Sequence, residues 1–104
     1  MNDETTTTLN DVAKALSHPA RVRIVELLSR QSECMGAEVF GELDLAQSTV
    51  SEHLRVLREA GVVRATPVGT RTVYCLVPGT LESFAEEVAA LAATSPRCLG
   101  GPNT

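Results

Sequence analysis

Residues 45–61, LAQSTVSEHLRVLREAG, decide the predicted fold of this chain. Apolar residues recur at Val50, Leu54 and Leu57, which is the spacing of one face of an α-helix. The segment ends at Gly61, and glycine is common just after the last turn of a helix. The opposite face carries short polar side chains and charged ones, a combination that the major groove of DNA accepts. We therefore expect an amphipathic helix with one face in the core and the other available to DNA.

The length and composition indicate one small domain. The chain has 104 residues, and a core of this size is marginally stable alone, so association with a second copy is expected. No apolar run reaches membrane-spanning length, and the acidic start, residues 1–11, lacks the features of a secretory signal. The three cysteines, Cys34, Cys75 and Cys98, form an odd and widely spaced set. This set argues against a disulfide framework and for a protein of the reducing cytoplasm.

The charge is unevenly distributed along the chain. The net charge of −4 at pH 7 disfavours simple electrostatic attraction to nucleic acid. Residues 47–74, however, contain four arginines against two glutamates, while acidic residues gather near both ends. Because each copy offers few cations to phosphates, DNA binding is expected to require a dimer.

Helical patterns also precede the segment 45–61. Residues 8–17 and 19–29 are predicted helices, separated at His18-Pro19 because proline suits the first turn of a new helix. A short helix over residues 36–42 is followed by a tight connection of about three residues. Two helices joined in this way, the second amphipathic, make a helix-turn-helix.

The pattern changes from helix to strand after Gly61. Residues 62–67 are rich in β-branched side chains, residues 71–77 alternate, and a turn signal lies between them. This predicts a two-stranded hairpin, the wing, with Arg71 at its tip.

The last predicted helix, residues 80–93, carries an apolar stripe at heptad spacing, and the first helix carries a similar one. We expect these two stripes to form a dimer interface. The predicted interface residues are Leu9, Val12, Leu16, Leu81, Phe84, Val88 and Leu91.

Together these elements predict a mainly α, α+β fold: a winged helix-turn-helix in the order α-α-α-α-β-β-α, dimerising through its N- and C-terminal helices. The winged domain is expected to span residues 8–93. It would lie between a disordered N-terminal segment, residues 1–7, and a flexible C-terminal tail, residues 94–104.

Three segments of the chain resemble the arsenical-repressor (ArsR/SmtB) family of bacterial regulators. They are ALSHPARVRIVELL (15–28), LAQSTVSEHLRVLREAGVV (45–63) and VGTRTVYCLV (68–77), and they occur in the family's order with the family's gaps. The resemblance covers roughly residues 9–92. It implies a homodimeric repressor that binds a palindromic operator and is released by a metal, metalloid or thiol-directed signal. Its two recognition helices would enter major grooves about 34 Å apart.

The candidate DNA contacts lie on the central helix and the wing. They are Gln47, Ser48, Thr49, Ser51, Glu52, His53, Arg55 and Arg71. The hydroxyls can bond phosphates or base edges, Arg55 can reach guanine or phosphate, and Glu52 can accept from cytosine. His53 lies beside Leu57 at the edge of the predicted core, so a packed, hydrogen-bonded histidine is the stronger interpretation.

The resemblance also bears on the signal. Metalloid sensors of the family carry a Cys-x-Cys pair entering the third helix, whereas residues 34–36 are Cys34-Met35-Gly36, with glycine in place of the second cysteine. Another family site uses histidines and carboxylates of the final helix to bind zinc, and residues 81–93 contain no histidine. Neither standard site is therefore expected.

The remaining candidates are the cysteines themselves. Arsenite, antimonite and soft metals favour thiolates, and Cys34 with Cys98 is the predicted pair. The resemblance implies that a tail cysteine can complete a metal site or pair with a second-helix cysteine in a persulfide sensor. Cys75 alternates with Val73 and Val77, so it is expected to fill the wing core rather than act as a third ligand. No cofactor beyond As(III), Sb(III) or a soft metal ion is expected.

Three functions fit the sequence. The first is a repressor released from operator DNA by a metalloid or soft metal. The second is a repressor that responds to redox or persulfide chemistry through Cys34 and Cys98. The third is a dimeric interaction module without specific DNA binding. An enzyme is not expected, because the sequence has no nucleophile and histidine arrangement with a supporting acid and no glycine-rich phosphate loop.

Overall fold

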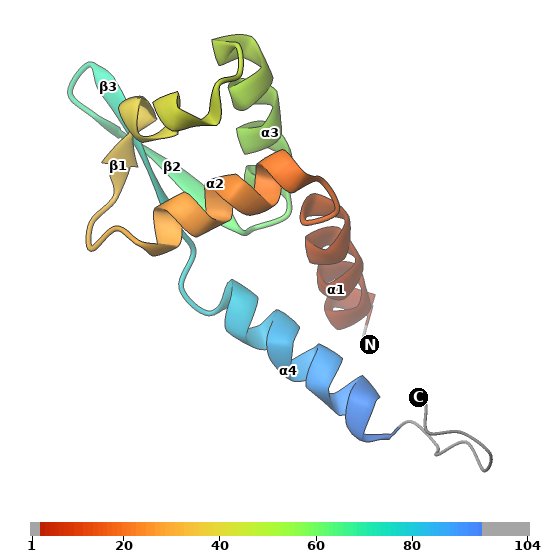
Figure 1. The fold of residues 1–104 in the computed structure, drawn as a ribbon. Coiled ribbons are helices and arrows are strands. Elements are labelled where there is room, and N and C mark those ends of the chain that lie inside the picture. The colour runs from red at the N-terminus through yellow and green to blue at the C-terminus, as the bar shows by residue number, and fades with distance from the viewer. Residues whose placement is uncertain (1–2, 95–104) are drawn as a thin grey trace.

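The computed structural model describes residues 3–94, with side chains described from residue 9 onward. No helix in this part of the chain is long and apolar enough to cross a membrane. The elements follow in the order α1 (Asp3–Ala15), α2 (Pro19–Ser29), β1 (Met35–Gly36), the 3-10 helix η1 (Ala37–Leu43), α3 (Gln47–Glu59), β2 (Val63–Val68), β3 (Arg71–Leu76) and α4 (Thr80–Ala93). Figure 1 shows the wing on one side of the body and α4 extending from it beside α1. The predicted winged helix-turn-helix fold is confirmed.

The first helix differs from the prediction at its start. α1 begins at Asp3 rather than at residue 8, so the backbone of residues 3–7, expected to be disordered, is helical. Once a helix exists, each residue added to its end gains a backbone hydrogen bond at little further cost, which favours such an extension. The second helix begins as predicted, with Pro19 in its first turn and the His18 side chain accepting a hydrogen bond from the amide of Ala20 at 3.0 Å.

The helix-turn-helix is formed by η1 and α3. The predicted α-helix over residues 36–42 is instead a 3-10 helix of 7 residues, a geometry that occurs in short segments. Asp44 follows it in the left-handed conformation, with φ 57°, which aspartate tolerates better than most residues. This turn redirects the chain into α3.

The sheet has three antiparallel strands in the order β1-β3-β2. The predicted hairpin is confirmed, with β2 and β3 in register from Val63 opposite Leu76 to Val68 opposite Arg71. The third strand was not predicted. β1 pairs Met35 with Tyr74 and Gly36 with Val73, and two residues are too few to produce a periodic pattern.

A single apolar core joins α1, α2, η1, α3 and the start of the wing. Val50, Leu54 and Leu57, the apolar face identified from the sequence, are all buried in it. Their burial fixes the rotation of α3, so the opposite face of the helix points to solvent.

Candidate nucleic-acid interface

The solvent-facing side of α3 carries the candidate DNA contacts. The exposed residues on it are Gln47, Ser48, Thr49, Ser51, Glu52 and Arg55. The N-cap residue, Ala46, makes no side-chain capping hydrogen bond. The first-turn amides are therefore not satisfied by a capping side chain, and such amides at the positive end of a helix suit phosphate oxygens. Short hydroxyl and amide side chains surround them, which allows close approach to a groove.

Arg55 is engaged by two carboxylates of its own helix. Its guanidinium pairs with Glu52 and with Glu59, the latter at 2.8 Å. The hydrogen bond from Arg55 lowers the pKa of the Glu52 carboxyl, and the two glutamates raise the pKa of Arg55. Contact between Arg55 and a base or phosphate therefore requires exchange of these partners. The periodicity placed Arg55 on the correct face but could not show this pairing.

Arg71 was predicted at the tip of the wing; it is the first residue of β3, directly after the turn, where it pairs with Val68. It also has an acidic partner. Its guanidinium is 3.2 Å from Glu38 of η1, and both side chains are exposed. The backbone of Gly36 passes close to this ion pair, and a Cβ atom at Gly36 would overlap the Arg71 guanidinium. The glycine therefore makes room for a contact between the wing and the helix-turn-helix.

His53 is a core residue rather than a DNA contact. It is 8% exposed, its ring centroid is 4.5 Å from that of His18, and its Nδ1 lies 3.2 Å from a guanidinium nitrogen of Arg21. Arg21 also donates to the carbonyl of Ala15, at the end of α1, at 2.7 Å. The packed interpretation is confirmed, and the place of His53 among the candidate DNA contacts is corrected. Arg21, which sequence reasoning missed, connects α1 to α3 through this group.

The environment of His53 predicts a pH dependence of stability. Burial, with the neighbouring charges of His18 and Arg21, lowers the pKa of His53 below the ordinary 6.5. As the pH falls below that value, the unfolded chain takes up the proton first, so the free energy of unfolding should decrease. Thermal unfolding between about pH 5 and about pH 8 measures the effect. H53Q should reduce the pH slope, and an unchanged slope in H53Q would assign the effect to other groups.

The predicted dimer residues fall into two groups. Val12 is completely buried in the core of its own chain, so it is removed from the predicted interface. Leu16, Leu81 and Phe84 are partly buried against the same core. Val88 of α4, by contrast, is 44% exposed. Leu91 of the same helix is also exposed, and Leu9 is half-buried on α1. Figure 1 shows that α4 extends away from the body.

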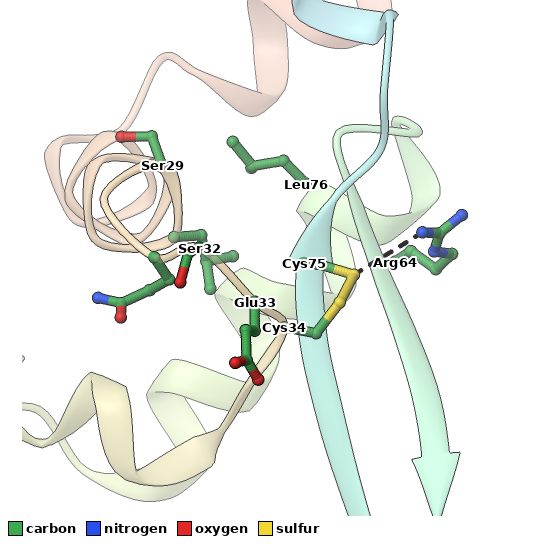
Figure 2. A pocket seen from close by; sticks show the side chains of 9 residues that line it. Ser29, Ser32, Glu33, Cys34, Arg64, Cys75 and Leu76 are labelled. Carbon is green, nitrogen blue, oxygen red and sulfur yellow. Dashed lines mark hydrogen bonds between the residues drawn. A yellow bond between two sulfur atoms is a disulfide. The ribbon is translucent and has the colours of Figure 1, made fainter.

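The cysteines are arranged differently from the prediction. Cys34 and Cys75 form a disulfide with a Cα–Cα distance of 4.5 Å, as Figure 2 shows. The expectation of a chain without disulfides is wrong, and Cys75 does not fill the wing core as a free thiol. Spacing could not reveal the pair because the two residues are 41 positions apart and meet only through the β1–β3 pairing. Cys98 lies outside the described residues.

The described residues do not fit the family's arsenite pair. The place of its second cysteine is occupied by Gly36, whose missing side chain leaves room for Arg71. Among the described side chains, no group of three or more histidine, cysteine, aspartate or glutamate residues is placed to hold a metal ion. The thiol chemistry available in this part of the chain is that of Cys34 and Cys75.

The sequence of the helix-turn-helix is similar to that of known regulators of transcription. Residues 18–65 match the family described as bacterial regulatory protein, arsR family. An uncharacterized HTH-type transcriptional regulator of Methanocaldococcus jannaschii is 34% identical over 67 residues, which cover 64% of this chain and 75% of that protein. The uncharacterized HTH-type transcriptional regulator Rv0081 of Mycobacterium tuberculosis is 41% identical over 63 residues. That match covers 61% of this chain and 55% of the relative, so it spans about half of the relative's length.

Solved structures agree with this assignment. The crystal structure of Rv0081 matches with a TM-score of 0.60 and 37% identity, covering 77% of this chain and 81% of that one. An ArsR-like transcriptional regulator from Rhodococcus sp. RHA1 matches with a TM-score of 0.76 and 26% identity, covering 89% and 84%. These proteins are regulators of transcription and not enzymes. The match of sequence across the helix-turn-helix and of fold across most of the chain shows that it belongs to the arsR family of bacterial regulatory proteins.

Proposed function

We propose that this protein is a homodimeric transcriptional repressor of the cytoplasm that binds a palindromic operator and releases it when its cysteines react. The observation that carries the proposal is the division of α3 into two faces. Its apolar face is buried in the core, while Gln47, Ser48, Thr49 and Ser51 are exposed together on the other face. Short hydrogen-bonding side chains on a fixed helix are suited to reading base edges in a major groove.

Two exposed arginines support the same orientation of α3 toward DNA. Arg58 on α3 and Arg64 on β2 are both exposed, and neither belongs to the ion pairs that engage Arg55 and Arg71. Arginines on α3 and the wing favour contact with the phosphate backbone beside the groove. Since each copy brings few such contacts, two copies are needed for firm binding, and binding should weaken as salt increases.

The proposed contact between the exposed face of α3 and DNA can be tested by removing two hydroxyls from that face. We expect the double variant S48A/S51A to keep its fold and to lose about tenfold or more in affinity for its operator, because each good base contact contributes roughly 1–3 kcal/mol. Fluorescence anisotropy with labelled operator DNA measures the change. S83A makes the same chemical change on the exposed surface of α4 and should bind as the parent does. Equal affinity in all three proteins would contradict the assignment of this face.

The exposed end of α4 supports the second part of the proposal. Val88 and Leu91 lie one helical turn apart and are 44% and 59% exposed, so together they offer apolar surface to a second copy. Phe84 and Leu81 continue this stripe toward the core of the same chain.

Dimerisation through α4 gives a direct prediction. V88D should shift the protein from dimer to monomer, since a charge replaces apolar surface that the second copy would bury, and operator binding should fall with it. Light scattering coupled to size-exclusion chromatography measures the mass. S83D places the same charge on an exposed position of the same helix and should remain dimeric. A V88D protein with the parent's mass would place the interface elsewhere.

The inducer is proposed to act on the cysteines, either by opening the Cys34–Cys75 disulfide or by binding the thiolates that its opening releases. Redox chemistry is favoured over a metalloid, because the described partner of Cys34 is Cys75 and the family's second cysteine is absent. A gel shift with the native upstream DNA, with and without glutathione, arsenite, antimonite, cadmium, persulfide and hydrogen peroxide, distinguishes these signals. A thiol that opens the disulfide should release the DNA, whereas hydrogen peroxide, which closes it, should not. C34S and C98S show which cysteine each signal requires, and release of both variants by a metalloid would remove these two residues from a metalloid site.

A further inference from the structure

We propose that Cys34 and Cys75 form a reversible thiol–disulfide site that controls how firmly the wing is held against the helix-turn-helix. The two residues continue the β1–β3 register. Met35 pairs with Tyr74 and Gly36 with Val73, so Cys34 and Cys75 lie directly opposite each other at the next position. Their Cα–Cα distance of 4.5 Å is the separation of a non-hydrogen-bonded cross-strand pair. The backbone pairing itself therefore brings the sulfurs together.

The disulfide joins two residues that line an open hollow. The disulfide lies in a hollow of about 330 Å³ between the end of α2 and the wing, lined in part by Ser29, Ser32 and Glu33 (Figure 2). Cys34 is exposed and Cys75 is half-buried, which makes Cys34 the sulfur that an external thiol can attack. A structural disulfide is ordinarily protected by burial, whereas this one joins an exposed residue to a half-buried one.

Arg64 lies beside the second sulfur. Its guanidinium is 3.8 Å from Sγ of Cys75, across the β2–β3 ladder, where Arg64 and Cys75 are register partners. A cation next to a sulfur favours the thiolate over the thiol, and the thiolate is both the better leaving group and the reactive nucleophile. The arrangement therefore assigns Cys75 as the sulfur released on reduction and the first to be oxidised.

The two directions of the reaction are balanced. On opening, the thiolate of a small thiol attacks Sγ of Cys34, the Cys34–Cys75 bond breaks and Cys75 leaves as a thiolate beside Arg64. A second small thiolate then releases Cys34 and forms the small-molecule disulfide. On closing, the Cys75 thiolate attacks a hydroperoxide, whose O–O bond breaks to give a sulfenic acid and hydroxide. The Cys34 thiolate then displaces the second hydroxide to form the disulfide. For hydrogen peroxide, two thiols supply two electrons and two protons, and two waters result.

The location of the bond explains what its opening would change. β1 consists of only two residues and continues directly into η1, which is followed by α3. The wing is held to this segment by the β1–β3 pairing, by the edge-on ring contact of Phe40 with Tyr74, by the exposed pair of Arg71 and Glu38, and by the disulfide. Of these, the disulfide is the only covalent one. Its loss should allow the wing to move relative to α3. Because the proposed DNA-binding surface is formed by the wing and α3 together, this movement should weaken DNA binding. The link to DNA binding rests on the proposed function, but the chemistry of the bond does not.

The test uses the C98S protein, so that the third thiol does not take part. The reduced protein is treated with hydrogen peroxide, its free thiols are blocked with a maleimide, and it is digested. Mass spectrometry should find a linked Cys34–Cys75 peptide. When the oxidised protein is treated with glutathione before blocking, this peptide should be absent although the protein remains folded. R64Q should close several-fold more slowly, whereas R58Q, the same change at an exposed arginine of α3, should close as the parent does. The absence of the linked peptide after peroxide treatment, or a bond that opens only on unfolding, would overturn the proposal.

Hydrogen exchange and DNA binding complete the test. Amides of β1 and β3 should exchange more slowly in the disulfide form than in the reduced form, and equal exchange would overturn the proposed hold on the wing. The disulfide form should bind operator more tightly than the reduced form. If neither form binds DNA, the proposed function fails, but the mass spectra and the exchange data still test the Cys34–Cys75 site. If both forms bind equally, the repressor function stands and the control by this bond fails.

Discussion

Replacing Leu57 with alanine is expected to lower the free energy of unfolding by about 2–5 kcal/mol, because the change removes buried apolar surface and leaves a cavity. Leu57 is completely buried, and it lies on the face of α3 that packs into the core. Domains of this size have a free energy of unfolding of only about 5–15 kcal/mol, so the substitution should remove a large part of it. Because Leu57 also fixes the position of α3, operator binding should weaken in the same variant.

Urea denaturation followed by circular dichroism measures this effect. The matched control is L45A, which makes the same change at a residue that is 42% exposed, just before α3. Its unfolding free energy should stay within about 0.5 kcal/mol of the parent's, as is usual at surface positions. Similar losses in L57A and L45A would contradict the burial of this face of α3 in the core.

Reducing the Cys34–Cys75 disulfide is expected to lower the free energy of unfolding by about 2–4 kcal/mol, because the open chain gains conformational freedom when it unfolds. The bond joins residues 41 positions apart, so it closes a long loop in the unfolded chain. The native backbone already places the two residues in register, so the open form should keep the winged fold.

Urea denaturation with and without a reducing agent measures the difference. C34S and C75S should each reproduce the lower stability of the reduced protein and should no longer respond to the reductant. C98S should respond as the parent does. A parent protein whose unfolding midpoint is the same in both conditions would show that the bond does not form or does not constrain the unfolded chain.

The sequence was most informative where a periodic pattern was long. The 3.6-residue period over residues 45–61 predicted α3 and its buried face, and the alternation after Gly61 predicted the hairpin within one residue at most ends. The proline at position 19 marked the start of α2 because proline favours the first turn of a helix. In each case local physical chemistry and the folded structure agree.

The features that were missed depend on contacts between distant segments. β1 is too short for a pattern, and the Cys34–Cys75 bond exists only because β1 pairs with β3. The periodicity identified Arg55 and Arg71 as exposed cations, but their pairing with glutamates is a matter of side-chain geometry. His53 was correctly interpreted as packed, whereas its partner Arg21 belongs to another helix and left no signal of its own. Whether a side chain is exposed or buried was therefore easier to predict than the residues with which it interacts.

The most direct test of DNA recognition by α3 is a titration of labelled DNA from upstream of the protein's own gene, at moderate salt, against a shuffled duplex of the same composition. We predict that the dimer binds the native palindrome roughly a thousandfold or more tightly than the shuffled DNA, as specific DNA-binding proteins do. We also predict that S48A/S51A narrows this ratio and S83A does not. Equal binding to the two duplexes, or binding to neither, would contradict the claim that this helix reads DNA.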